Sequence, residues 1–292
     1  MNRILILVLV VILPLFSSAK KEDLKLRLIK NARHIYSISQ ENQAIENGKI
    51  SEVEQRINLK IEHRVLDILS NGNYSVEISL KRFSIQMKHN SKVIRYDSDT
   101  VDVSNPLYKT LNFLTNVRLN YEVTPEGEVR NLKGFDPIRK EIEKDLRLAN
   151  LLRNFGSEIF YTELYNYISR ADVAVGETWM KNSVLPDLNN LKCDVHYTLK
   201  EVTLQSLKIA QKSSFQMVSD LPKAPDGSAS KVKETGTLNG TLVIDPKTNM
   251  RISSSLTQSA DITMMKENSA PEKEKAKTLK LVTKTTFTLE KK

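Results

Sequence analysis

Three aspartates stand close together at Asp97, Asp99 and Asp102, and carboxylate oxygens are the ligands that Ca²⁺ binds in proteins. The glycine and the closer ligand spacing of a calcium-binding helix–loop–helix are missing from this segment. Aspartate is also common in turns, because its side chain bonds to nearby backbone groups. The sequence therefore favours an exposed loop at the end of a strand over a calcium site.

Ser228 and Lys231 have the Ser-x-x-Lys spacing of the serine nucleophile in penicillin-binding enzymes. In those enzymes the serine begins a helix, which places the lysine one turn away. Here the pair stands in a segment rich in Pro, Gly and Ser, and the companion Ser-Asp-Asn and Lys-Thr-Gly motifs are missing. We therefore expect no serine nucleophile at this position.

The four histidines, His34, His63, His89 and His196, are far apart and do not form the His-Glu-x-x-His pattern of a zinc hydrolase. A single cysteine, Cys193, can form neither an intramolecular disulfide nor a cysteine-rich metal site. The motifs of α/β-hydrolases and of nucleotide-binding proteins are also missing. The sequence predicts no catalytic residue, metal or cofactor, and hence a protein that is not an enzyme. A hydrolase with a scattered active site is the least supported class.

Four aromatic residues are the candidate ligand-binding residues: Trp179, the only tryptophan, and Tyr161, Tyr165 and Tyr167. The tryptophan could cap an apolar cavity, and the tyrosines could line its mouth from one helix. A lone tryptophan is more often part of the core, because its side chain buries a large area, and the tyrosines could also pack only on the sheet. The sequence leaves both interpretations open.

Alternation of apolar and polar residues dominates most of the chain and predicts β-strands with one buried face. The alternating runs cover residues 24–28, 36–38, 53–65, 74–87, 117–123, 191–199, 238–244, 250–264 and 279–289. In the run 53–65 the apolar parity includes His63, which we expect to be buried and hydrogen-bonded, whereas His196 falls on a polar parity. The parity changes at Lys81-Arg82, which predicts a β-bulge that keeps the same face inward.

Helix signals are confined to the middle of the chain. Asp136-Pro137 is a typical helix start, followed by apolar residues at helical spacing up to Leu152. A second helix is expected over 157–168 and a short one over 107–114. The predicted fold class is mainly β (α+β), with a long curved antiparallel sheet or half-barrel and two or three helices packed on its concave face.

Residues 1–19 have the three parts of a secretory signal peptide. A basic start at Arg3 precedes an apolar run from Ile4 to Phe16, and Ser17-Ser18-Ala19 supplies small residues before a cut at Lys20. We therefore expect export to the periplasm or the extracellular space. No other apolar run is long enough to span a membrane, so no membrane span is expected after cleavage.

The chain has 292 residues, a formal charge of +9 and 40% apolar residues, which is typical of a globular protein. Its basic residues alternate with acidic ones, and this pattern and export argue against nucleic acid as a partner. Residues 20–292 are predicted to form a single β-rich domain. The alternative is two similar halves, 20–135 and 170–292, joined by a helical segment 136–169. Two Pro turns of similar sequence, at 123–130 and 244–251, suggest this duplication, and convergent turn chemistry explains them as well.

The order of several short motifs resembles that of a family of exported bacterial proteins of unknown function. The motifs are Tyr96-Asp97-Ser98, an Asn-Pro-led helix, the segment from Tyr121 to Gly134, and Val175-Gly176-Glu177-Thr178-Trp179. The resemblance covers nearly the whole chain after residue 19 and implies no catalytic residues, since the family has no assigned activity. The layout is also similar to periplasmic lipoprotein-localisation carriers, in which a curved sheet plugged by helices holds acyl chains.

Two functions follow as expectations. The first is an exported, non-enzymatic binding protein whose concave face shelters a lipid or another apolar small molecule. The alternative is a structural or interaction protein of the envelope, with a filled core and with an envelope protein bound by loops 219–233 and 266–277.

Overall fold

The computed structural model describes residues 20–46, 49–89, 92–104, 108, 111–144, 161, 163–185, 191–220, 230–266 and 278–290. The predicted signal peptide, residues 1–19, lies outside the described residues. So do most of the two predicted loops, at 221–229 and 267–277. No helix of the described residues is both long and apolar enough to cross a membrane.

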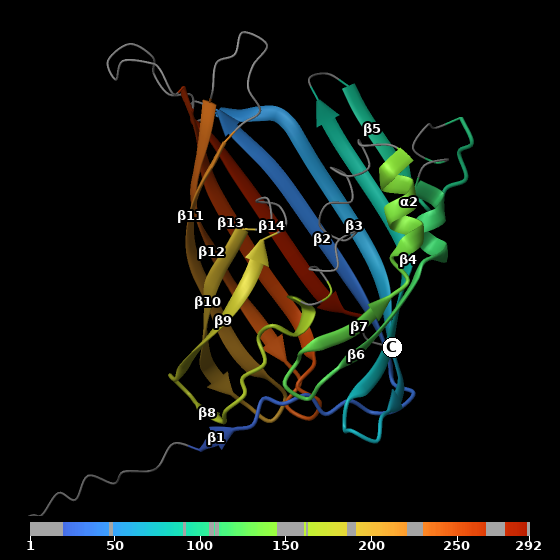
Figure 1. Ribbon diagram of the computed structural model, residues 1–292, viewed down its shortest axis with the longest axis vertical. Coiled ribbons are helices and arrows are strands. Elements are labelled where there is room, and N and C mark those ends of the chain that lie inside the picture. The colour runs from blue at the N-terminus through green and yellow to red at the C-terminus, as the bar shows by residue number, and fades with distance from the viewer. Residues whose placement is uncertain are drawn as a thin grey trace, which may run out of the picture.

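A single twelve-stranded antiparallel sheet forms most of the molecule, which confirms the predicted mainly β fold (Figure 1). The strand order is β7-β6-β4-β3-β2-β14-β13-β12-β11-β10-β9, and β5 pairs with β4 beside this path. The strands are β2 (Arg33–Glu46), β3 (Lys49–Ile68), β4 (Tyr74–His89), β5 (Lys92–Asp97), β6 (Arg118–Val123), β7 (Val129–Lys133), β9 (Thr178–Leu185), β10 (Leu191–Val202), β11 (Leu207–Asp220), β12 (Ser230–Ile244), β13 (Arg251–Lys266) and β14 (Thr278–Leu289). A small second sheet pairs β1 (Lys21–Glu22) with β8 (Val173–Ala174).

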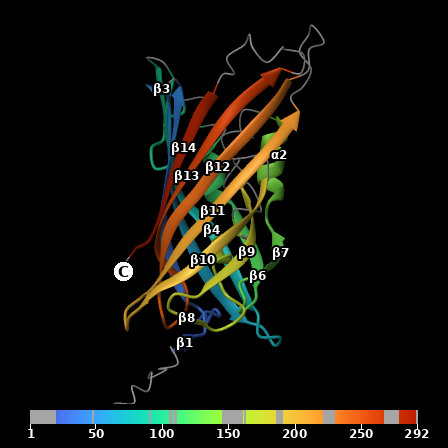
Figure 2. The same ribbon diagram turned by 90° about the vertical axis from the view of Figure 1, so that its left-hand side faces the viewer.

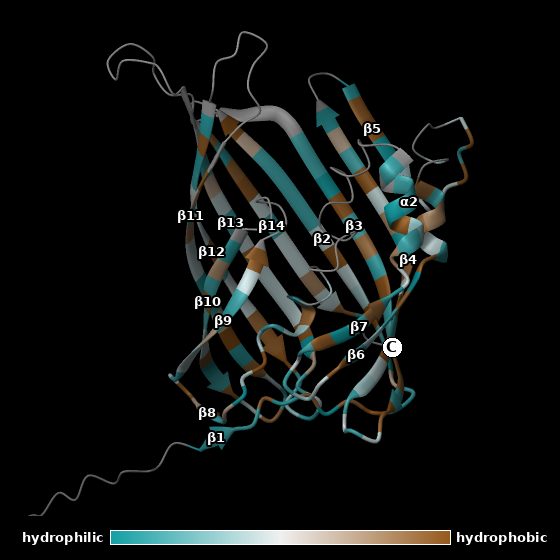
Figure 3. Cartoon of the chain, in the orientation of Figure 1, coloured by the Kyte–Doolittle hydropathy of each residue, from teal (hydrophilic) through white to brown (hydrophobic). Residues whose placement is uncertain are grey.

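The large sheet is an open, curved trough rather than a closed barrel. Within the described residues, the edge strands β7 and β9 each pair with one neighbour only. Figure 2 shows the curvature from the side, and Figure 3 shows how hydrophobic and hydrophilic residues alternate along the strands. At the middle of the sheet β14 pairs with β2, with Phe287 opposite Ile38, so the first and last long strands of the chain lie side by side.

The predicted β-bulge at Lys81 is confirmed. Lys60 pairs with Arg82 and Ile61 with Leu80, which leaves Lys81 as the extra residue on β4. The bulge compensates for the parity change, because Ile78 and Phe83 on either side of it are both buried.

The segment after β1 is buried as the alternation predicts, but residues 23–29 are not part of a strand. Leu24, Leu26 and Leu28 all lie in the core. The backbone N–H of Leu26 donates to the oxygen of Pro125 (2.7 Å), and that of Arg27 donates to the oxygen of Thr248 (3.0 Å). The two Pro turns that resemble each other in sequence therefore hold the same segment, and this bonding replaces a strand partner.

The expectation of two or three helices is wrong, because α2 (Asp136–Lys144) is the one α-helix among the elements of the described residues. It begins where Asp136-Pro137 predicts. Short 3₁₀ helices, η1 (Asn112–Asn116) and η2 (Glu163–Tyr165), stand where the other two predicted helices end. Tyr165 and Tyr167 are two residues apart and both enter the core, whereas a helix would direct them to opposite sides. Tertiary packing thus overrides helix propensity in this segment.

Candidate ligand-binding site

A short segment crosses the concave face of the sheet at its lower end in Figure 1. We call it the strap and define it as Tyr161 with residues 163–170. The turn that the sequence predicts at Thr124–Gly127 supports the strap from below. Gly127 has a positive φ of 81°, and a Cβ at this position would lie 2.8 Å from the backbone oxygen of Tyr165. The turn therefore needs glycine both for its conformation and for this close contact.

Tyr165 is the centre of a buried hydrogen-bond network. Its hydroxyl lies 2.5 Å from Nε2 of His63 on β3 and 2.8 Å from the hydroxyl of Tyr121 on β6. Burial lowers the pKa of His63 to about 3, so this histidine is neutral at physiological pH. Burial also raises the pKa of Tyr165 well above its usual value. The expectation that His63 is buried and hydrogen-bonded is confirmed.

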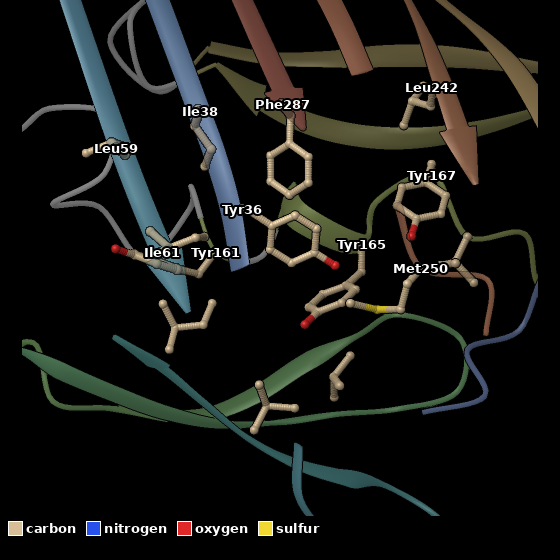
Figure 4. Close-up of a cluster of buried hydrophobic side chains, with 14 of the residues drawn as sticks. Tyr36, Ile38, Leu59, Ile61, Tyr161, Tyr165, Tyr167, Leu242, Met250 and Phe287 are labelled. Atoms are coloured by element: carbon tan, nitrogen blue, oxygen red, sulfur yellow. The ribbon is translucent and has the colours of Figure 1, made fainter. Parts of the chain in front are cut away.

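Tyr167 links the strap to the second half of the sheet (Figure 4). Its hydroxyl donates to the backbone oxygen of Asn249 (2.8 Å), and its own backbone oxygen accepts a hydrogen bond from Nε1 of Trp179 (3.1 Å). The guanidinium of Arg251 lies over the rings of Tyr167 and Phe287, 5.2 and 5.1 Å from their centroids. Such contacts contribute about 1 kcal/mol each when they are partly buried.

Arg251 and Glu163 form further hydrogen bonds at the strap. The Arg251 Nη2 donates to the backbone oxygen of Leu164 (3.1 Å). Glu163 accepts hydrogen bonds from the hydroxyl of Ser183 (2.7 Å) and the amide of Asn166 (3.0 Å). Burial raises the pKa of Glu163, and these hydrogen bonds act in the opposite direction.

Three of the four predicted ligand-binding residues, Tyr165, Tyr167 and Trp179, lie close together in the structure. Tyr165 and Tyr167 line a cavity of about 10 Å³, and Trp179 bonds to the backbone of Tyr167. Tyr161 lies apart, against Phe135, beside a second cavity of about 20 Å³. Each cavity has room for about one water molecule. The ligand-binding role of these residues stays a prediction, and the contacts described here make them the anchors of the strap.

Beyond the strap, some inward side chains of the concave face are less completely covered, although Ala260 and Val232 are buried there as well. Below and around the strap the inward apolar side chains are buried, as in Ile61 and Leu242. Farther along the strands, four inward apolar side chains are only partly buried, and we call them the upper inner face: Met87, Met217, Leu256 and Leu281. Their inward direction follows from strand parity, because Leu281 pairs with Ala260, whose side chain is buried.

The other motifs singled out from the sequence form no site in the described residues. Arg82 forms ion pairs with Asp97 and with Asp99 (3.2 Å), which neutralises two carboxylates of the predicted acidic loop. No group of three potential metal ligands occurs in the part of the chain that the structure describes. Ser228 lies outside the described residues. His196 is exposed, as its polar parity predicts.

Arg251 and Glu163, which anchor the strap, were not predicted from the sequence, because no local pattern distinguishes them from surface charges. Gln40 and Gln258, two buried amides on the concave face, were not predicted either. A signal for these two was present, since each is a polar residue on the apolar parity of its strand. Gln40 follows Tyr36 and Ile38 on that parity.

A family model described as a family of unknown function (DUF6263) matches residues 71–251. Among solved structures, the β domain of the Bordetella autotransporter BrkA is 7% identical and covers 89% of this chain and 100% of its own, with a TM-score of 0.23. A domain of a proposed outer membrane lipoprotein-sorting protein from Vibrio parahaemolyticus is 8% identical and covers 88% and 83%, with a TM-score of 0.17. An outer membrane channel from Pseudomonas putida F1 is 9% identical and covers 91% and 98%, with a TM-score of 0.19. These scores are too low to support an argument about function. No curated protein matches the chain.

Proposed function

The chain belongs to the DUF6263 family of unknown function, and we propose that it is an exported, non-enzymatic binding protein that holds an apolar ligand against the concave face of its sheet. The ligand is an acyl chain or a molecule of similar shape. The ligand lies on the upper inner face, beyond the strap. The strap closes the lower end of the trough, so the bound acyl chain ends against it.

The change in burial along the concave face is the observation that carries this proposal. Around the strap, inward apolar side chains such as Ile209 and Ile244 have an exposed fraction of 0%. On the upper inner face, Met217 and Leu281 are only partly buried and are not members of the main hydrophobic core. An apolar ligand that covers these side chains gains about 25 cal/mol for each Å² removed from water.

The dimensions of the upper inner face suit a chain-like ligand. On β13, the inward positions Leu256, Ala260 and Ile262 are apolar, with the polar Gln258 between Leu256 and Ala260, and six residues of a strand span about 20 Å. Methionines at two positions, Met87 and Met217, add adaptable side chains that can follow ligands of different shape. A long, mainly apolar and adaptable strip favours ligands with a flexible hydrocarbon chain over compact polar ligands.

A fluorescence titration of residues 20–292 with N-phenyl-1-naphthylamine, an uncharged apolar probe, tests the proposal. We expect saturable binding. Met217→Asp places a charge on the upper inner face and should weaken the probe's affinity by about tenfold, because a buried charge without a partner is costly. Val218→Asp is the matched control, since Val218 is the next residue on β11 and is 53% exposed on the outer face.

The titrations of the parent chain and the two variants have three possible outcomes. Weaker binding by Met217→Asp, with binding by Val218→Asp close to that of the parent chain, supports a ligand on the concave face. Saturable binding that both variants retain would place the probe elsewhere and contradict the proposal. No saturable binding by the folded parent chain would also contradict it.

One observation favours a second candidate, an envelope interaction protein with a filled core. The cavities beside the strap are only about 10 and 20 Å³, so protein side chains fill the lower part of the trough. In that case the upper inner face is covered by the chain itself, and the functional surfaces lie on loops 219–233 and 266–277. A parent chain that binds no apolar probe, and that loses partner capture when either loop is deleted, would favour this candidate.

A further inference from the structure

A second set of inward residues lies between the strap and the far ends of the four central strands. These residues are uncharged and polar, and we call them the polar ledge: Gln40, Asn42, Gln55, Gln258, Thr283 and Thr285. The strand register places them in two adjacent rows. Gln40 is opposite Thr285, and Thr283 is opposite both Asn42 and Gln258.

The polar ledge has apolar side chains on both sides, and one buried carboxylate, Glu234, lies farther along the concave face, opposite Met217. On one side of it, Ile38 is opposite Phe287, and both side chains are buried. On the other side, Leu281 is opposite Ala260, which is 1% exposed. Burying uncharged polar groups costs free energy unless they form hydrogen bonds, so a polar band inside an apolar trough needs partners.

Some of these polar groups form hydrogen bonds with one another within the polar ledge. Gln40 donates from Nε2 to Oδ1 of Asn42 (3.1 Å), and Asn42 donates from Nδ2 to Oε1 of Gln55 (2.8 Å). Gln258 is different. Its exposed fraction is 9%, and no hydrogen bond joins its side chain to another group of the described residues. A primary amide has two N–H donors and one acceptor oxygen. In Gln258 these groups face the trough without a partner among the described residues.

From this arrangement we propose that the polar ledge recognises the uncharged head of an amphiphile, a head rich in hydroxyl or amide groups. The inference rests on the proposed function, because the hydrocarbon part of the same ligand lies on the upper inner face. Amides and hydroxyls both donate and accept, as sugar hydroxyls and amide groups do. The six residues of the polar ledge include no Lys, Arg, Asp or Glu, so a phosphate or carboxylate head finds no counter-charge among them.

Displacement of bound N-phenyl-1-naphthylamine by three probes tests this specificity, at concentrations below those at which the amphiphiles form micelles. The probes are n-dodecyl-β-D-maltoside, dodecylphosphocholine with the same chain and a zwitterionic head that carries a phosphate, and free maltose. We expect the maltoside to displace the dye at a concentration about tenfold lower than the phosphocholine, which corresponds to about one additional hydrogen bond. Free maltose, which has no chain, should displace none.

Gln258→Leu should abolish the preference for the maltoside while dodecylphosphocholine displaces the dye as before. Gln216→Leu is the matched control, because Gln216 is exposed on the outer face of β11, and it should keep the preference. The inference is overturned if the dye binds and the parent chain shows no preference, if Gln258→Leu keeps the preference, or if free maltose competes as well as the maltoside. Absence of dye binding would instead contradict the proposed function itself.

Discussion

The hydroxyl of Tyr165 and Nε2 of His63 lie 2.5 Å apart in the buried core, although the two residues are 102 positions apart in the chain. This contact ties the strap to β3, in the first half of the sheet. Arg251 and Asn249 tie the same strap to the second half, through Leu164 and Tyr167. The strap is therefore held by polar contacts from both halves of the sheet, and it closes the lower end of the trough.

Tyr165→Phe removes one hydroxyl and leaves two partners, His63 and Tyr121, without their hydrogen bonds to residue 165. We expect the free energy of unfolding to fall by about 2 kcal/mol, because a buried polar group that loses its partner costs 1–3 kcal/mol by the usual estimate. Denaturant titration followed by circular dichroism measures the change. Tyr197→Phe is the control, since Tyr197 is also buried but no hydrogen bond of its hydroxyl is seen in the described residues. Equal stabilities for the two variants would show that the network contributes little.

His63 should make the stability depend on pH. Its pKa is lowered from 6.5 to about 3 in the folded chain, so only the unfolded chain binds this proton between these values. The free energy of unfolding should therefore fall as the pH drops below 6.5, by about 1.4 kcal/mol per pH unit once the unfolded histidine is fully protonated.

Urea titrations between pH 7.5 and 5 measure this slope above the range in which most carboxylates titrate. His63→Phe should reduce the slope, whereas His196→Phe, which changes an exposed histidine, should leave it unchanged. A slope that survives in His63→Phe would mean that another group is responsible.

Arg251→Met should loosen the strap. The substitution removes the hydrogen bond to Leu164 and the contacts with the rings of Tyr167 and Phe287, and we expect it to cost about 3 kcal/mol. Arg130→Met removes only an exposed ion pair with Glu128 and should cost at most about 1 kcal/mol.

Trp179 provides a local signal for this prediction, because it is the only tryptophan of the chain and bonds to the backbone of the strap. Its fluorescence emission should shift to longer wavelength in Arg251→Met as water reaches the indole. An emission spectrum identical to that of the parent chain would show that Arg251 is not needed to seat the strap.

Much of the sheet could be predicted from the sequence, because each strand has one solvent-exposed face and one buried face. The parity change at Lys81 even located a β-bulge, since the structure keeps Ile78 and Phe83 on the same side. The helical prediction was wrong for residues 163–168, the described part that begins with η2, because Tyr165 and Tyr167 pack by contacts with distant residues, which local spacing does not reveal.

The candidate site was predictable only in part. Sequence singled out Tyr161, Tyr165, Tyr167 and Trp179, and the structure shows three of them buried and one partly buried, around the strap. The pairing of His63 with Tyr165 depends on which strand faces the strap. That information lies in the topology of the whole sheet and not in any local pattern.

Native mass spectrometry of the exported chain, purified without detergent, can show directly whether a ligand occupies the concave face. We predict a polypeptide that begins at Lys20 and carries one bound lipid-sized molecule, and we predict that Met217→Asp lowers the bound fraction while Val218→Asp does not. A bare polypeptide mass for the folded parent chain, which also takes up no added apolar probe, would contradict a ligand on the concave face.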